Sequence, residues 1–246
     1  MEKILSYGGR TKEPDIRMLY DMSDVIYDQE WLKGAENLEL YYMYRDLSLS
    51  KKDAQIIKEN NLRYDITIIP PRMLGQEFVK TAGHYHPFIQ HNLTYTEIYE
   101  VLEGEAFYLL QRLDDKNNDS VLDVVVIKAT QGDKVIIPPL YGHITINSSN
   151  KTLKMANLVA RDFSSVYDPI KEKKGGAYFL VKGGLIRNEN YAEVPTPRVL
   201  EPTNFSEVGL SKNKEIYALI REPEKLEYLT NPQKYEWLFE KILEKE

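Results

Sequence analysis

Short extended segments fill most of the first three quarters of the chain. Runs rich in Val, Ile, Tyr and Thr alternate with clusters of Gly, Pro, Asn and Asp, as in proteins built from β-strands and turns. The predicted strands are residues 38–44, 64–69, 78–86, 98–102, 106–111, 123–128, 134–137, 144–147, 154–159 and 177–181. Strands at these intervals predict an all-β barrel or sandwich.

Two helices are predicted beside the strands. Residues 50–61 begin with Ser50, a good N-cap, and end in an Asn-Asn stop signal. A second helix should begin near Pro232, because the residues after it place apolar side chains on one stripe. The stripe consists of Tyr235, Leu238, Phe239, Ile242 and Leu243. We expect a barrel domain over residues 1–185 and a C-terminal extension over residues 186–246, whose stripe packs on the barrel or at a subunit contact.

Composition excludes several classes of protein. The chain has 246 residues, 42% of them hydrophobic, so it can bury a sizeable core. Its 32 basic and 38 acidic residues give a net charge of −6, which argues against a nucleic-acid partner. No apolar run is long enough to span a bilayer and the N-terminus lacks a signal-peptide core, so we expect a cytoplasmic protein with no membrane partner. The absence of cysteine leaves nitrogen and oxygen to hold any metal.

Three of the four histidines fall into one constellation. His84 and His86 are two residues apart, so both side chains share one face if the segment is extended. Glu97 and Tyr99 have the same spacing in a later predicted strand, and His143 lies in a third. Three imidazoles and one carboxylate suit a divalent transition metal such as iron, nickel, manganese or zinc. An isolated His-x-His pair would be weak evidence by itself.

The residue spacing around Glu97 and His143 strengthens the prediction of a metal site. Residues 97–104, and residues 132–147 with Pro138 and His143, resemble the two sequence motifs of the cupin family. Three departures accompany the resemblance. Phe78 and Leu140 stand where the family has glycine, and ten residues, 87–96, separate the second histidine from the glutamate. His91 lies in that long loop and is expected to be exposed.

These departures point to one subgroup of cupins. Residues 17 to 181 resemble the cupin-type glucose-6-phosphate isomerases of archaea and a few bacteria, most closely in the signature Lys-Thr-x-Gly-His-Tyr-His that begins at Lys80. The resemblance implies a cupin fold, a double-stranded β-helix or jelly-roll barrel, with peripheral helices. It also implies one divalent metal per subunit, with iron preferred and nickel, manganese or zinc as alternatives, and a homodimer.

The same resemblance assigns roles to individual residues. The implied metal ligands are His84, His86, Glu97 and His143. The implied substrate and phosphate contacts are Thr67, Thr81, Gly83, Tyr167 and Lys173. Tyr99 corresponds to a residue of the sugar pocket. Two hydroxyls and a glycine amide can donate hydrogen bonds to a phosphate. Lys80, Arg72 and Lys173 are the nearest candidates for positive charge.

The implied reaction is aldose–ketose isomerisation of a phosphorylated hexose. The metal would stabilise negative charge on an enediol-like species, and Glu97, with Tyr99 beside it, would move the proton between C1 and C2. A hydride shift with Glu97 acting only as a ligand is the competing mechanism. Two other functions stay open on the residues alone: a cupin oxygenase with strict iron dependence, and a sugar-binding cupin without catalytic activity.

Overall fold

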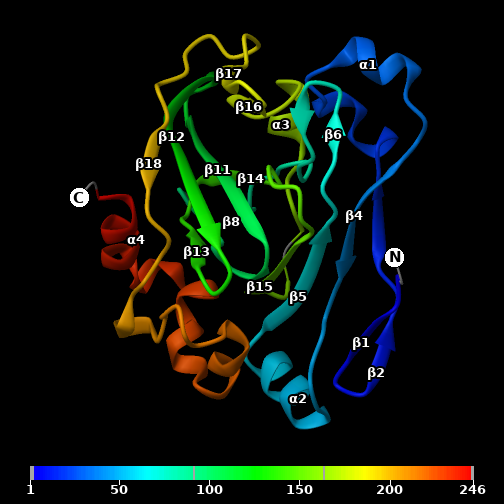
Figure 1. Ribbon diagram of the computed structural model, residues 1–246. Coiled ribbons are helices and arrows are strands. Elements are labelled where there is room, and N and C mark those ends of the chain that lie inside the picture. Colours follow the sequence, from blue (N-terminus) through cyan, green and yellow to red (C-terminus); the bar gives the residue numbers. More distant parts are fainter. Residues whose placement is uncertain (1–2, 91, 163, 245–246) are drawn as a thin grey trace.

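Two large sheets form the body of the molecule (Figure 1). The computed structural model describes residues 3–90, 92–162 and 164–244. One sheet has six strands in the order β13-β10-β15-β5-β4-β3, and the other has four in the order β14-β11-β12-β18. In the described residues the neighbours in these sheets run antiparallel, apart from the parallel pair β12 and β18.

The strands of the two sheets have the following bounds. The six-stranded sheet consists of β3 (Asp15–Met18), β4 (Glu39–Tyr44), β5 (Leu62–Ile69), β10 (Glu97–Glu103), β13 (Lys134–Ile137) and β15 (Leu153–Ala160). The four-stranded sheet consists of β11 (Glu105–Asp114), β12 (Asn117–Thr130), β14 (Tyr141–Ile146) and β18 (Arg198–Leu200).

Smaller elements surround the two sheets. A second four-stranded sheet contains β6 (Met73–Leu74), β7 (Glu77–Phe78), β16 (Tyr178–Val181) and β17 (Gly184–Arg187). Two hairpins are formed by β1 (Leu5–Tyr7) with β2 (Arg10–Lys12) and by β8 (Phe88–Gln90) with β9 (Leu93–Thr94). The α-helices are α1 (Gln29–Gly34), α2 (Lys51–Glu59), α3 (Asp168–Glu172) and α4 (Glu236–Leu243). The 3-10 helices are η1 (Tyr20–Val25), η2 (Ser206–Val208), η3 (Ile216–Arg221), η4 (Pro223–Leu229) and η5 (Pro232–Lys234).

The main core lies between the two large sheets. Val101 of β10 and Met155 of β15 pack in one cluster with Tyr108 of β11 and Val125 of β12, and all four side chains are buried. Alternation along each strand directs every second side chain into this interior. The two facing sheets confirm the predicted all-β barrel, and they match the jelly-roll arrangement that the resemblance to cupins implied.

A second core covers the outer face of the six-stranded sheet. Ile66 of β5 and Ile98 of β10 are buried there against Leu219 of η3 and Leu238 of α4. The C-terminal segment, orange and red in Figure 1, therefore packs on its own barrel. The division of the chain at residue 185 stays a prediction. None of the helices in the described ranges combines the length and apolar character needed to cross a bilayer.

Two sequence predictions about local structure are wrong. Residues 78–86 do not form one strand, because β7 ends at Phe78 and Gly83 has a φ of +77°, a left-handed conformation that interrupts an extended run. The C-terminal helix does not run unbroken from Pro232, since the 3-10 helix η5 ends at Lys234 and α4 begins only at Glu236. The helix at residues 50–61 is confirmed as α2, with the Ser50 side chain accepting a hydrogen bond from the Asp53 amide.

Candidate metal centre and pocket

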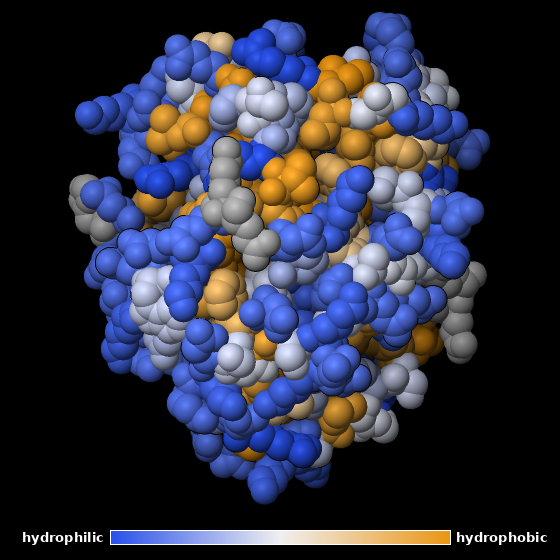
Figure 2. Space-filling view, turned by 60° about the vertical axis from the view of Figure 1, so that its left-hand side comes forward, coloured by the Kyte–Doolittle hydropathy of each residue, from blue (hydrophilic) through white to orange (hydrophobic). Residues whose placement is uncertain are grey.

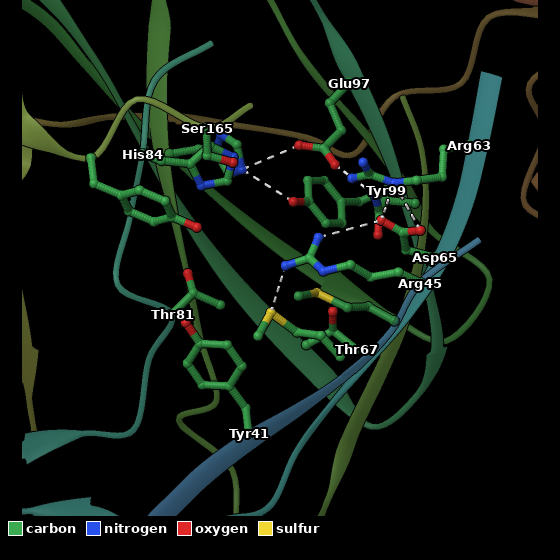
Figure 3. A pocket seen from close by; sticks show the side chains of 15 residues that line it. Tyr41, Arg45, Arg63, Asp65, Thr67, Thr81, His84, Glu97, Tyr99 and Ser165 are labelled. Atoms are coloured by element: carbon green, nitrogen blue, oxygen red, sulfur yellow. Dashed lines mark hydrogen bonds and ion pairs between the residues drawn. The ribbon is translucent and has the colours of Figure 1, made fainter. Parts of the chain in front are cut away.

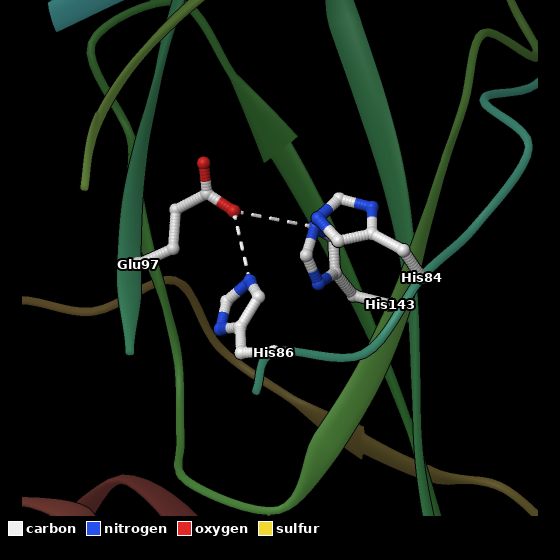
Figure 4. Close-up of side chains that lie close together, drawn as sticks. All are labelled: His84, His86, Glu97 and His143. Carbon is white, nitrogen blue, oxygen red and sulfur yellow. Dashed lines mark hydrogen bonds and ion pairs between the residues drawn. The ribbon is translucent and has the colours of Figure 1, made fainter. Parts of the chain in front are cut away.

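Four side chains converge on one point inside the barrel (Figure 4). Each of His84, His86, Glu97 and His143 offers a potential ligand atom, and these atoms all lie within 4.8 Å of one another. Glu97 begins β10 and His143 lies in β14, while the other two histidines come from the segment that follows β7. Three separate parts of the chain therefore build the cluster that the sequence predicted.

Backbone pairing fixes two of the histidines against each other. The His84 amide donates to the His143 carbonyl at 3.2 Å, and the His143 amide donates back at 3.0 Å. Their rings lie 4.4 Å apart, centroid to centroid. Gly83 makes this approach possible, because a Cβ at that position would lie 2.6 Å from Cγ1 of Ile144. A larger residue at 83 would displace His84.

The orientation of His86 favours a bound cation. Its Nδ1 lies 2.9 Å from the Tyr95 carbonyl, which can only accept, so Nδ1 carries a proton and Nε2 is the nitrogen turned toward the cluster. That Nε2 faces Glu97 Oε2 at 3.3 Å, and His143 Nε2 faces the same oxygen at 3.4 Å. An imidazole nitrogen and a carboxylate oxygen this close are held together by a proton or a cation between them. The four side chains therefore fit a divalent metal.

Electrostatics keep the cluster in its metal-binding form. Burial and the neighbouring His86 lower the pKa of His84 to about 3. Burial, with His84 and His86 nearby, also holds the pKa of His143 well below its usual value. Burial acts to raise the pKa of Glu97, but the hydrogen bond and charge of His86 outweigh it, so this pKa is lowered. The Asn157 amide also donates to Glu97 Oε1 at 2.6 Å. The lowered pKa values favour neutral imidazoles at His84 and His143 and an ionised carboxylate at Glu97, which are the forms that bind metals.

Tyr99 stands beside the cluster as a neutral phenol. Its hydroxyl lies 3.1 Å from Nε2 of His143. Burial, followed by the charge of Glu97, raises the pKa of Tyr99 well above its usual value. Tyr99 therefore keeps its proton and can donate a hydrogen bond.

A cavity opens from the cluster (Figure 3). It is lined by Tyr41, Met43, Arg45, Arg63, Asp65, Thr67, Thr81, His84, Glu97, Tyr99, His143, Met155, Asn157, Ser165 and Tyr167. Thr81 Oγ1 accepts a hydrogen bond from the Thr145 amide at 3.0 Å, so its own proton is available to a ligand. The Tyr167 ring lies 5.6 Å from that of His84.

Some predicted residues lie away from the cavity. Lys173 forms an ion pair with Asp119, and its ammonium lies 5.7 Å from the Tyr191 ring, so the structure does not bring it to the pocket. The buried Lys80 is paired with Glu77 at 2.6 Å. His91 lies outside the described residues.

The sequence prediction missed several polar residues that line the cavity, among them Arg45, Arg63, Asp65 and Asn157. Alternation from Thr67 could have found two of them, because Arg63 and Asp65 precede it by four and two residues in β5. No alternation pattern of this kind pointed to Asn157. It faces the pocket because β15 pairs it with Tyr99 on one side and Asp65 on the other.

A known protein family and several individual proteins match this chain. Residues 16–196 match the model of the family described as glucose-6-phosphate isomerase. The chain belongs to the glucose-6-phosphate isomerase family. A glucose-6-phosphate isomerase of Thermococcus litoralis is 30% identical over 159 residues, covering 64% of this chain and 75% of the relative. That of Pyrococcus furiosus is 25% identical over 172 residues, covering 70% and 83%. The family predicted from the sequence is confirmed.

The solved structures that match this chain include more distant proteins. A Bacillus subtilis oxalate decarboxylase with Mn(II) centres is 17% identical, with a TM-score of 0.36, over 52% of this isomerase-family chain and 28% of that protein. The 7S globulin of Momordica charantia is 15% identical, with a TM-score of 0.36, over 53% of this chain and 34% of that protein. The matched part is about a third or less of each of these proteins.

Proposed function

We propose that this chain interconverts glucose 6-phosphate and fructose 6-phosphate at a divalent metal centre. The observation that carries the proposal is the convergence of three histidines and Glu97 at a cavity that also presents the hydroxyls of Thr67 and Thr81. Membership of the glucose-6-phosphate isomerase family supports the substrate class, a phosphorylated hexose.

The four ligands of the metal are His84, His86, Glu97 and His143. A divalent cation there supplies a Lewis acid that stabilises negative charge on the sugar oxygens. Iron is the metal we propose, because a mixed imidazole and carboxylate set suits it, with nickel, manganese and zinc as alternatives.

Glu97 moves the proton between C1 and C2 of the open-chain sugar. Its two oxygens have different surroundings: Oε2 faces His86 and His143, whereas Oε1 accepts the Asn157 hydrogen bond and keeps a further lone pair. Oε1 is therefore the oxygen that takes the proton. Tyr99, held protonated by burial, donates a hydrogen bond to a substrate oxygen. In the alternative mechanism hydrogen passes directly between the carbons and Glu97 is a ligand only.

The phosphate group binds at the other polar part of the cavity. Thr67 and Thr81, which line the cavity, donate through their hydroxyls, and the amide of Gly83, the residue before His84, is the third proposed donor. Tyr167 covers the mouth beside His84. Lys173 is proposed as a substrate contact from the sequence alone; in the structure it is paired with Asp119 and does not line the cavity.

A coupled assay tests the function. Fructose 6-phosphate is supplied, glucose 6-phosphate is detected, and turnover is compared before and after chelation and after metal is restored. We expect turnover that chelation abolishes and metal restores, with the circular dichroism spectrum unchanged. A protein that binds sugar phosphate without turnover would be a binding cupin, and oxygen consumption without isomerisation would mark an oxygenase.

A homodimer and a cytoplasmic location complete the proposal, together with a C-terminal unit over residues 186–246. Figure 2 shows the side of the molecule that is on the left in Figure 1, where apolar side chains gather within a mostly hydrophilic surface. Leu122 of β12 and Val199 of β18 are 52% and 71% exposed, so this sheet edge is a candidate subunit contact. Light scattering of the purified protein tests the dimer.

A further inference from the structure

Arg45 lines the cavity wall and is only partly engaged by carboxylates. It follows β4 and is held by two carboxylates, with Nε 3.0 Å from Asp15 Oδ2 and Nη1 3.7 Å from Asp65 Oδ2. Its remaining terminal nitrogen, Nη2, contacts the sulfur of Met43 at 3.2 Å. One end of the guanidinium is therefore anchored, while the other lies against a weak acceptor.

The free end of this guanidinium points toward the hydroxyl groups of the pocket. Met43 is the register partner of Thr67 across β4 and β5, so contact with the Met43 sulfur brings Nη2 toward the Thr67 row. Figure 3 shows the Arg45 guanidinium projecting into the cavity between Tyr99 and Thr67, with Thr81 across the open space. A ligand bound to the two threonines would meet this cation.

Two of the other basic residues near the cavity are paired with carboxylates. Arg63 also lines it, but its Nε bonds both oxygens of Asp65, at 3.1 and 2.9 Å. Lys80 is committed to Glu77, and the chain as a whole carries a charge of −6. A phosphate dianion entering this protein needs local positive charge, and a guanidinium fork matches the geometry of phosphate oxygens.

We propose that Arg45 binds the phosphate group of the substrate and thereby selects phosphorylated over unphosphorylated sugars. Asp65 is a positioning residue, since its carboxylate pairs with the guanidinium. The inference rests on the proposed isomerase function and adds a specificity-determining residue to it.

Kinetic measurements on three variants test the proposal. Arg45→Met keeps much of the aliphatic stem and removes the charge, Arg45→Lys keeps a charge without the fork, and Arg161→Met is the matched control. Arg161 is also a partly buried arginine paired with a carboxylate, Asp46, at 2.6 Å, but it does not line the cavity.

One lost charged hydrogen bond predicts a rise of about 10- to 100-fold in KM for fructose 6-phosphate in Arg45→Met, with kcat within a few-fold of the parent. The KM of Arg45→Lys should lie between those of the parent and Arg45→Met, and the KM of Arg161→Met should match that of the parent. Asp65→Asn should also raise KM more than it lowers kcat. A fall in kcat with unchanged KM in Arg45→Met would overturn the proposal, as would an equal rise in KM in Arg161→Met.

Binding of inorganic phosphate gives a test that does not depend on turnover. Isothermal titration of the metal-loaded protein should show at least ten-fold weaker phosphate binding in Arg45→Met than in the parent, at equal metal content. Equal affinity in both would overturn the role of Arg45. If the parent binds phosphate through Arg45 but does not isomerise the sugar phosphate, the isomerase function fails while the phosphate site stands.

Discussion

The hydrogen bond from Asn157 to Glu97 should control how tightly the metal binds. The Asn157 amide donates to Oε1 at 2.6 Å, both residues are buried, and Oε2 of the same carboxylate faces His86 and His143. Asn157→Leu keeps the approximate volume of the side chain but removes the donor. The carboxylate then loses a charged hydrogen bond worth about 1.5–3 kcal/mol.

Part of the lost free energy should appear as weaker metal binding, because this hydrogen bond fixes the orientation of the Glu97 carboxylate. At about 1.4 kcal/mol for each ten-fold change, we expect metal affinity to fall by about 10- to 100-fold. The assay is a competition titration between the protein and a chromophoric chelator, using Mn²⁺ or Zn²⁺, with metal content of the purified protein as a second measure.

Asn188→Leu is the matched control. Asn188 is also buried, and its amide donates to the carbonyls of Lys173 and Gly176, outside the metal cluster. Both variants should lose thermal stability, but only Asn157→Leu should lose metal affinity. The reasoning is refuted if both variants bind metal as tightly as the parent, or if both lose affinity equally.

Four further predictions concern the cluster and the phosphate site. His143→Ala should lose nearly all bound metal and turnover, whereas His91→Ala should keep parental metal content; equal loss in both would place the ligand elsewhere. Thr81→Val should raise KM for fructose 6-phosphate by about ten-fold or more through the lost donor, and Thr81→Ser should not; similar KM values in both would move the phosphate site. Metal-loaded Glu97→Gln should lower kcat by about 10²–10⁴, and substrate deuterated at C2 should lose label to solvent in the parent; near-parental kcat would favour a hydride shift. Burial lowers the pKa of His84 to about 3, so below its usual pKa of 6.5 the unfolded chain takes up the proton first. The metal-free protein should therefore lose stability in urea as the pH falls from 6.5 toward 3, with a shallower slope in His84→Gln, and an identical slope would contradict this origin.

The sequence predicted the class of fold and the ligand set because both depend on local patterns. Alternation of side chains along a strand gave the shared face of Glu97 and Tyr99, and both line the cavity. The pair at His84 and His86 was placed correctly, with rings 5.4 Å apart, although the segment that carries them is not a continuous strand. Gly83 interrupts that strand, and a glycine's φ angle cannot be read from alternation alone.

The pairing of strands determined which further side chains face the pocket, and the sequence alone did not predict this. The pocket side of Asn157 follows from its register between Tyr99 and Asp65, which lie 58 and 92 positions away along the chain. The orientation of Arg45 depends on the distant carboxylates of Asp15 and Asp65. Side-chain periodicity is a property of a single strand, whereas register is a property of two strands that meet only in the folded chain. The sequence by itself therefore determined the barrel class and the proposed histidine and glutamate ligands, and only the tertiary structure determined which residues orient those side chains and which cation faces the proposed phosphate contacts.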